Sequence, residues 1–220
     1  MERTPMKIQV DMMIFDLDGT LITSGRDIAD AVNHTLVSFG LPVKSYHEII
    51  QWIGDGIQPL ISRALGEENN RHFQDALAMF SDYYEKHMLD TTVPYEGIHE
   101  ALQFFSDTKK IILSNKRVYY AKRIIDALSL SKHFVDIIGA DSTPYKKPDS
   151  RVVLPVLQGY AVRKERAVMI GDGVNDLVLA NNTGMVSCAF LGGLTEPNRL
   201  LALSPDVTYE NPRDLIYLFE

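Results

Sequence analysis

Two acidic clusters, more than 150 residues apart in the chain, each come directly after a short apolar run. The first cluster is Asp16-Leu17-Asp18-Gly19-Thr20 after residues 12–15, and the second spans residues 171–176 after residues 167–170. Apolar runs of this length that end in a glycine-containing turn predict buried strands of a parallel sheet. Because side chains just past the carboxyl ends of such strands meet in one crevice, the clusters would bring up to four carboxylates together.

Carboxylates in contact repel one another, so folding gains nothing from gathering them. A cation makes the arrangement favourable, and Mg²⁺ prefers oxygen ligands while keeping several waters. The clusters therefore predict a magnesium site, with Asp16, Asp18, Asp172 and Asp176 as candidate ligands. For Asp176, which would lie in the first turn of a helix, compensation of the helix dipole is the alternative role.

The charge balance of the chain bears on its partners. The 220 residues include 22 basic and 29 acidic side chains, a formal net charge of −7, which argues against a nucleic acid or an anionic membrane surface as the main partner. No apolar run approaches the roughly 18–20 residues that span a bilayer, and residues 1–7 lack the apolar stretch of a secretory signal. We expect a cytoplasmic protein with no membrane partner, as a monomer or a homodimer.

Strand-like and helix-like patterns alternate in most of the chain. This alternation predicts an α/β fold, a Rossmann-like parallel sheet core with helices on both faces. The expected strands lie near residues 8–16, 110–114, 135–140, 166–170 and 185–190, and the expected helices between the later strands at residues 119–128, 150–160 and 176–182.

The segment 24–92 differs, because it shows helical periodicity and no convincing strand. Ser24-Gly25-Arg26-Asp27 resembles a capping box at the start of a first helix, a second helix is expected over 56–65, and a third carries an apolar stripe from Phe73 to Met88. An all-helical block directly after the first strand predicts a cap domain, residues 24–92, on a core formed by 1–23 and 93–220. Hinges at the two connections would let the cap exclude water from the crevice.

Four motifs follow one another in a fixed order: Asp16 to Thr20, Ser114-Asn115 after a strand, Lys147-Pro148, and Asp172 to Asp176. This order resembles the haloacid dehalogenase superfamily of phosphotransferases, and the resemblance covers nearly the whole chain, including the helical insert. The superfamily implies an enzyme that uses Mg²⁺ and a small phosphorylated metabolite.

The resemblance assigns catalytic roles to three residues. Asp16 would be the nucleophile that becomes an aspartyl-phosphate, Asp18 the acid and base, and Lys147 the cation that neutralises charge on the transferring group. Asp16 as a metal ligand or a solvated strand end, and Asp18 as a cap of a turn or helix, are the alternatives. Lys146 rivals Lys147 on residue type alone, and the adjacent Pro148 of the family pattern selects Lys147.

Substrate binding is expected from Thr20, Ser114, Asn115 and Lys147. Ser114 and Asn115 could hydrogen-bond phosphoryl oxygens, although both residue types are also favoured as helix N-caps. The Thr20 hydroxyl could orient Asp18 or satisfy backbone groups.

The expected reaction is magnesium-dependent hydrolysis of a small phosphate monoester. Residues 27–32 and 53–57, which lie in the expected cap, resemble phosphoglycolate phosphatases. A phosphoglycolate carboxylate would need a cationic partner, for which Arg26, Arg63 and Lys116 are unranked candidates.

Alternatives within the superfamily are a β-phosphoglucomutase-like phosphomutase, a pyrophosphatase, or a sugar or nucleotide phosphatase. A non-catalytic phosphate-binding module is the alternative from another class. Such a module would be expected to have lost Asp16, Asp18 or Lys147, and all three are present.

Overall fold

Six parallel strands form one sheet in the order β3-β2-β1-β4-β5-β6 in the computed structural model, which describes residues 7–220. The chain places β2 and β3 on one side of β1 and then crosses to β4 on the other side, so the strand order reverses next to β1. The strands are β1 (Met12–Phe15), β2 (Lys109–Leu113), β3 (Asp136–Ile138), β4 (Ala167–Gly171), β5 (Val186–Phe190) and β6 (Val207–Tyr209).

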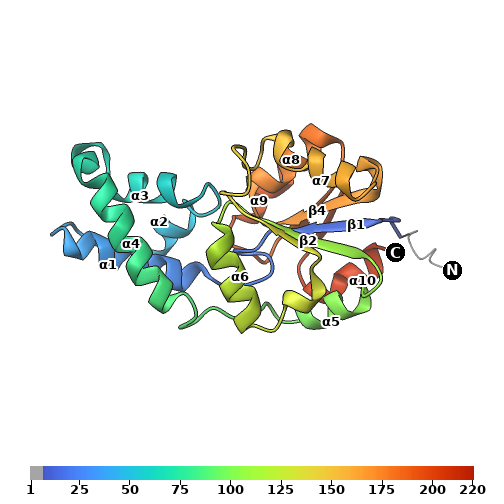
Figure 1. Cartoon of the computed structure of the whole chain (residues 1–220), viewed down its shortest axis with the longest axis horizontal. Coiled ribbons are helices and arrows are strands. Elements are labelled where there is room, and N and C mark those ends of the chain that lie inside the picture. The colour runs from blue at the N-terminus through green and yellow to red at the C-terminus, as the bar shows by residue number, and fades with distance from the viewer. Residues whose placement is uncertain (1–6) are drawn as a thin grey trace.

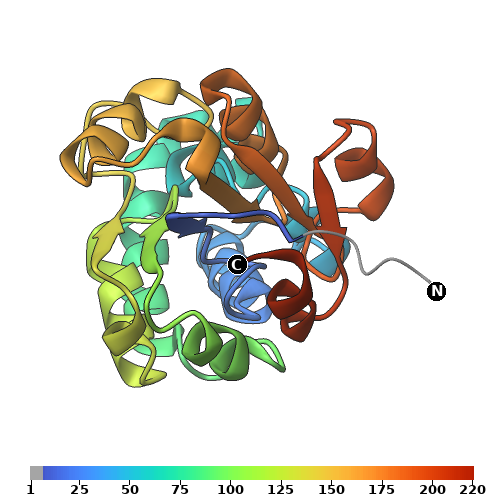
Figure 2. The ribbon, with the colours of Figure 1, turned by 90° about the vertical axis from the view of Figure 1, so that its right-hand side faces the viewer.

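Helices cover both faces of the sheet (Figures 1 and 2). Met12 and Ile14 of β1 pack into one apolar cluster and Met13 and Phe15 into another, so the central strand is buried on both faces and reads as a continuous apolar run. The predicted α/β fold is thereby confirmed. One face carries α7 (Leu154–Gly159) and α8 (Val174–Thr183), with α9 (Pro197–Leu201) beside α8, and the other carries α5 (Ile98–Phe104), α6 (Val118–Ala127) and α10 (Leu215–Leu218).

The segment between β1 and α5 is helical, as expected, and lies off the carboxyl ends of the strands (Figure 1). Phe80, Tyr84 and Met88 of the predicted apolar stripe are buried, whereas Phe73 and Leu77 are partly buried. The helices are α1 (Gly25–Ser38), α2 (Tyr46–Ile50), α3 (Ile57–Leu65) and α4 (Phe73–His87).

The two connections between this helical segment and the sheet lie side by side. The backbone N–H of Thr23 donates to the carbonyl of Val93 at 2.8 Å. Asp27, which is 2% exposed, accepts hydrogen bonds from the backbone N–H groups of Thr91 and Thr92 at 3.0 Å and from their hydroxyls at 2.5 and 2.7 Å. The expected capping box at Ser24 is therefore wrong: Asp27 binds the returning chain, and the Ser24 hydroxyl caps no backbone group.

Asp27→Ala should lower the free energy of unfolding by about 2–4 kcal/mol, because it leaves the buried N–H and O–H donors of Thr92 and the part-buried donors of Thr91 without an acceptor. Chemical denaturation of the two proteins measures this difference. Asp30→Ala is the matched control, since Asp30 lies one turn further along α1 in an exposed pair with Arg26 and should cost less than about 1 kcal/mol. Equal losses for the two variants would contradict a clamp at the hinge.

Other elements differ from expectation or were not foreseen. A helix starting at Ser150 would carry Pro155 in its interior, where proline has no N–H to donate and crowds the preceding turn. The chain instead makes a 3₁₀ turn over Ser150–Val152 and starts α7 at Leu154, with Pro155 in the first turn. The short elements β6, α2, α5, α9 and α10 were not predicted.

The expectation about a secretory signal concerns residues 1–7, of which residues 1–6 lie outside the described residues. Within residues 7–220, none of the helices has the length and apolar character that crossing a membrane requires.

Candidate active site

Three carboxylates meet where β1 and its neighbour β4 end. Asp16 directly follows β1, Asp172 directly follows β4, and Asp176 lies in the first turn of α8. One oxygen atom of each lies within 4.8 Å of the others, and all three residues are buried. The pairing of Phe15 with Ile170 explains the convergence, because it brings the carboxyl ends of the two strands to the same level.

The Lys147 ammonium lies between two of these carboxylates. Its Nζ is 2.8 Å from Asp16 Oδ1 and 2.5 Å from Asp176 Oδ1, and the residue is buried. Burial lowers the pKa of Lys147, but the charges of Asp16 and Asp176 outweigh it and hold the pKa above the ordinary value of a lysine. The rival Lys146 instead donates to the backbone carbonyl of Asp55 at 2.9 Å. The structure thus places Lys147 beside the expected nucleophile.

Asp172 is oriented from both sides. The Thr20 hydroxyl donates to its Oδ1 at 2.7 Å and the backbone N–H of Leu194 donates to its Oδ2 at 2.8 Å. Thr20 therefore orients Asp172 and not Asp18. Its hydroxyl also accepts from the backbone N–H of Asp172 at 2.9 Å, which is the alternative role expected for this residue. Gly19 has a φ of 87°, and a Cβ at this position would collide with the Asp172 carboxylate, so the turn needs a glycine.

The donor set fits a divalent cation. Burial, together with the charge of Asp16, raises the pKa of Asp172 to about 8, and burial raises the pKa of Asp176 to about 7. When all three carboxylates are ionised, the Lys147 ammonium leaves two negative charges unbalanced in a buried place. A hard cation that prefers carboxylate oxygens, such as Mg²⁺, would balance them.

Asp18 lies outside this cluster. Its Oδ1 accepts from the Ser24 hydroxyl at 2.5 Å, and the Lys116 ammonium donates to both of its oxygens at 2.9 and 2.8 Å. The carboxylates that converge are those of Asp16, Asp172 and Asp176, and the role of Asp18 as a metal ligand stays a prediction. Sequence reasoning missed the roles of Ser24 and Lys116 toward Asp18.

Ser114 and Asn115 follow β2 and are buried, but they differ in what they contact. The Ser114 hydroxyl accepts from the backbone N–H of Lys116 at 3.2 Å, which leaves its own O–H group to donate. Both N–H groups of the Asn115 amide are used, one by the carbonyl of Gly54 at 2.8 Å and one by that of Lys147 at 3.1 Å. Asn115 therefore positions Lys147 and the helical insert and has no free donor for a phosphoryl oxygen.

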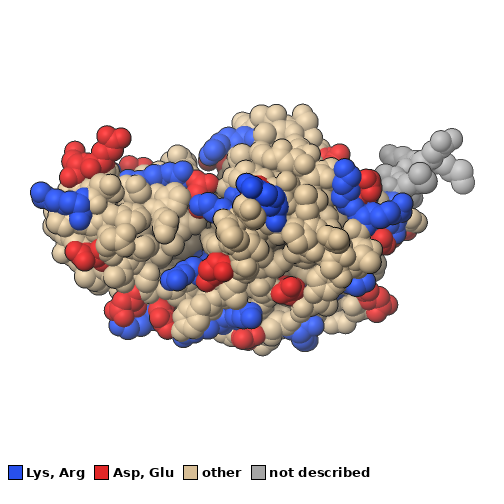
Figure 3. Space-filling model, turned by 45° about the horizontal axis from the view of Figure 1, so that its top comes forward, with Lys and Arg blue, Asp and Glu red and all other residues tan. Residues whose placement is uncertain are grey.

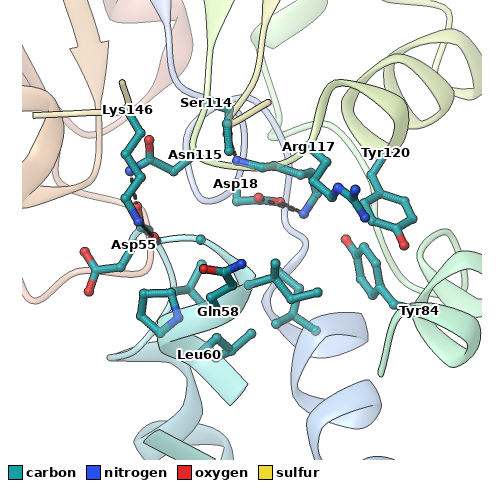
Figure 4. Close-up of a pocket in the computed structure, with 18 of the residues that line it drawn as sticks. Asp18, Asp55, Gln58, Leu60, Tyr84, Ser114, Asn115, Arg117, Tyr120 and Lys146 are labelled. Carbon is teal, nitrogen blue, oxygen red and sulfur yellow. Dashed lines mark hydrogen bonds and ion pairs between the residues drawn. The ribbon is translucent and has the colours of Figure 1, made fainter. Parts of the chain in front are cut away.

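A cavity of about 470 Å³ opens between the strand ends and the helical insert (Figure 4). Residues 53–57, which we call the cap loop, form part of its wall. Asn175 binds this loop through Asp55 Oδ1 at 2.8 Å, and Asn115 binds it through the Gly54 carbonyl. Gly56, with a φ of 93°, approaches so closely that a Cβ would lie 3.1 Å from the carbonyl oxygen of Asn115.

Comparison with known proteins agrees with this architecture. The sequence matches the family of haloacid dehalogenase-like hydrolases over residues 13–190. Phosphoglycolate phosphatase 1 of Pseudomonas aeruginosa is 32% identical over 217 residues, covering 93% of this chain and 78% of the relative. The phosphoglycolate phosphatase of Aquifex aeolicus is 31% identical over 211 residues, covering 95% of this chain and 96% of the relative.

Solved structures share the fold. A crystal structure of a predicted phosphoglycolate phosphatase from Haemophilus somnus 129PT matches with a TM-score of 0.89 at 23% identity, covering 94% of this chain and 97% of that one. A haloacid dehalogenase-like hydrolase from Streptococcus pneumoniae matches with a TM-score of 0.85 at 24% identity, with the same coverage. The α/β sheet and the three converging carboxylates thus define a hydrolase of known architecture. The chain belongs to the haloacid dehalogenase-like hydrolases, which confirms the family and the enzymatic nature predicted from the sequence.

Proposed function

We propose that the protein is a magnesium-dependent phosphatase that hydrolyses a small, phosphoglycolate-like phosphate monoester through an aspartyl-phosphate on Asp16. The observation that carries the proposal is the placement of the Asp16 carboxylate, 2.8 Å from the Lys147 ammonium and within a cluster of buried carboxylates at a cavity. The names of the relatives, which are phosphoglycolate phosphatases, support the same reaction class.

The proposed chemistry divides between two carboxylates. Asp16 attacks phosphorus, so that an Asp16–phosphorus bond forms while the ester bond breaks, and protonated Asp18 gives its proton to the departing oxygen. Ionised Asp18 then takes a proton from the water that attacks phosphorus and releases Asp16 with inorganic phosphate. The contacts of Asp18 with Lys116 and Ser24 suit its ionised form.

Asp16, Asp172 and Asp176 would hold Mg²⁺, with Thr20 and Leu194 fixing the direction of Asp172. When bound, Mg²⁺ would supply positive charge against the phosphoryl oxygens. Lys147 stabilises the same developing charge from the other side of Asp16, and the free hydroxyl of Ser114 is available to donate to a phosphoryl oxygen.

Phosphate release from a panel of monoesters, with Mg²⁺ and with a chelator, tests the proposal. The panel contains 2-phosphoglycolate, sugar phosphates, nucleotides and pyrophosphate. Turnover that disappears with the chelator supports a magnesium phosphatase, and the best substrate defines its class. Turnover that is unchanged by the chelator, or absent for every member, contradicts the proposal.

Mg²⁺ should stabilise the protein more at about pH 9 than at about pH 6, because below about pH 7–8 it must displace protons from Asp172 and Asp176. Without metal, protonation of Asp172 and Asp176 stabilises the folded state, because their pKa values are raised there. This contribution to stability is fully present below about pH 4 and is lost as the pH rises through about 8. The stabilisation by Mg²⁺ should therefore be larger at about pH 9, where the stabilisation by protonation has been lost. The melting temperature with and without Mg²⁺ at the two pH values measures the difference, at about 2–4 °C per kcal/mol.

Asp172→Asn is the control for this prediction, since it removes one proposed ligand and one of the two titrating groups. It should abolish most of the Mg²⁺-dependent rise in melting temperature. An equal rise for the native protein at both pH values would contradict metal binding by these carboxylates.

The division into a core of residues 1–23 and 93–220 and a moving cap of residues 24–92 forms part of the proposal. It is supported by the clamp between the two connections at Asp27 and Thr91-Thr92. On the face drawn in Figure 3, basic and acidic side chains are interspersed, which is in keeping with a small metabolite and not a nucleic acid as the partner. The cytoplasmic location and the monomeric or dimeric state stay predictions.

A further inference from the structure

The cavity contains a buried hydroxyl group that the proposed chemistry does not use. Tyr84 of α4 is 2% exposed, and its hydroxyl has no hydrogen-bond partner among residues 7–220. Tyr84 lines the cavity, and its hydroxyl points toward Asp18 and Arg117 (Figure 4). The other buried side chain without a partner in the described chain, Tyr209, does not line this cavity. Leaving a buried polar group without a hydrogen-bond partner costs free energy. When such a group lines a cavity, a polar group of a bound ligand can supply the missing partner.

Lys116 lies directly beside this tyrosine. Its side chain is 8% exposed, and its Nζ lies 4.9 Å from the centroid of the Tyr84 ring. An ammonium group has three N–H donors, and the two oxygens of Asp18 accept two of them. The sheet and the helical insert thus each bring one polar group to the same part of the cavity, the ammonium of Lys116 and the hydroxyl of Tyr84.

We propose that Lys116 and Tyr84 form a recognition subsite for a carboxylate group of the substrate. The inference rests on the proposed function, because a phosphoryl group on Asp16 places the departing oxygen at Asp18. Lys116 contacts the same Asp18, so a group that it binds lies within a few bonds of that oxygen. In 2-phosphoglycolate, the carboxylate is attached to the carbon that carries the ester oxygen. A carboxylate also accepts from an ammonium and a hydroxyl together.

Arg26 and Arg63, the other two candidates from the sequence, and the neighbouring Arg117 are placed less favourably. The Arg26 side chain is 64% exposed and pairs with Asp30. Arg63 pairs with Asp55 at 2.5 Å. Neither arginine lines the cavity. Arg117 does line the cavity, but its side chain is 56% exposed. Lys116 is therefore the buried cation that sits next to the expected position of the departing group.

Tyr84→Phe tests the subsite because it removes only the hydroxyl. We compare 2-phosphoglycolate with ethyl phosphate, which carries a methyl group in place of the carboxylate. The variant should lower kcat/KM for phosphoglycolate by about 10- to 100-fold, the effect of losing a hydrogen bond to a charged group. For ethyl phosphate the change should stay within about threefold, since no partner of the hydroxyl is lost. The melting temperature should not fall, because the hydroxyl removed is unpaired.

Tyr120→Phe is the matched control. Tyr120 lines the same cavity, but its hydroxyl already donates to the carbonyl of Ser81 at 3.4 Å. The preference for phosphoglycolate over ethyl phosphate should therefore persist in this variant. An unchanged preference in Tyr84→Phe, or an equal loss of preference in both variants, overturns the subsite.

A binding measurement separates this inference from the proposed function. In an Asp16→Asn background with Mg²⁺, calorimetry should show tighter binding of phosphoglycolate than of ethyl phosphate. Adding Tyr84→Phe should weaken only phosphoglycolate, again by about 10- to 100-fold. If monoesters are hydrolysed without any preference for the carboxylate, the subsite is wrong and the phosphatase stands. If no monoester is hydrolysed but the binding preference depends on Tyr84, the subsite stands and the proposed function is wrong.

Discussion

Asp16→Asn is expected to lower kcat by about 10⁴-fold or more, because an amide cannot replace the carboxylate as the attacking group. The fold should stay intact: the amide has nearly the same shape, and the change removes the charge by which Asp16 repels the carboxylates of Asp172 and Asp176. Lys147 keeps its contact with Asp176 at 2.5 Å. Phosphate release and the melting temperature of the same preparation measure the two parts of the prediction.

Asp30→Asn makes the same chemical change on an exposed part of α1 and should leave turnover within about twofold. Acid quenching of the native enzyme during turnover, followed by mass spectrometry, should find a phosphoryl group on the peptide that contains Asp16. Near-normal magnesium-dependent hydrolysis by Asp16→Asn would show that another group attacks phosphorus.

Lys147→Met is expected to have the second largest effect, and it should reduce both activity and stability. The ammonium lies between Asp16 and Asp176, and its loss leaves two buried carboxylates without a cation. Removing one partner of a buried pair costs about 3–5 kcal/mol, and losing one group that stabilises the transferring charge costs about 10²–10³ in kcat. Because the pKa of Lys147 is raised in the folded state, its contribution is fully present below about pH 10.

Lys146→Met provides the matched control one residue away. Lys146 donates to the Asp55 carbonyl from an exposed position, so its loss should cost less than about 1 kcal/mol. Denaturation at neutral pH and steady-state kinetics on both variants check the comparison. A large loss of activity in Lys146→Met with near-normal activity in Lys147→Met would reverse the assignment between the two lysines.

The parts of the fold that follow from local pattern were predicted well. The buried runs 12–15 and 167–170 are too short and too apolar for surface helices, so they specify central strands, and residues after parallel strands meet at one edge. The strand β6 was missed because three residues carry no usable periodicity, and its conformation depends on pairing with β5. The predicted helix start at Ser150 was wrong because apolar periodicity does not show that Pro155 is tolerated only in the first turn of a helix.

The partners of the polar side chains required the tertiary structure. Thr20 binds Asp172, which is 152 residues away, and Lys116 binds Asp18, which is 98 residues away. Nothing in the local sequence specifies which of several nearby carboxylates each side chain will bind. The Tyr84 hydroxyl, which has no partner among residues 7–220, could not be predicted either, because an aromatic residue on an apolar helical stripe indicates a core position. Sequence alone determined the central strands, the longer helices and the identity of the chemical groups, since these depend on short-range periodicity and composition. Their pairing depends on side-chain direction and on how the helical insert packs against the strand ends, which only long-range contacts specify.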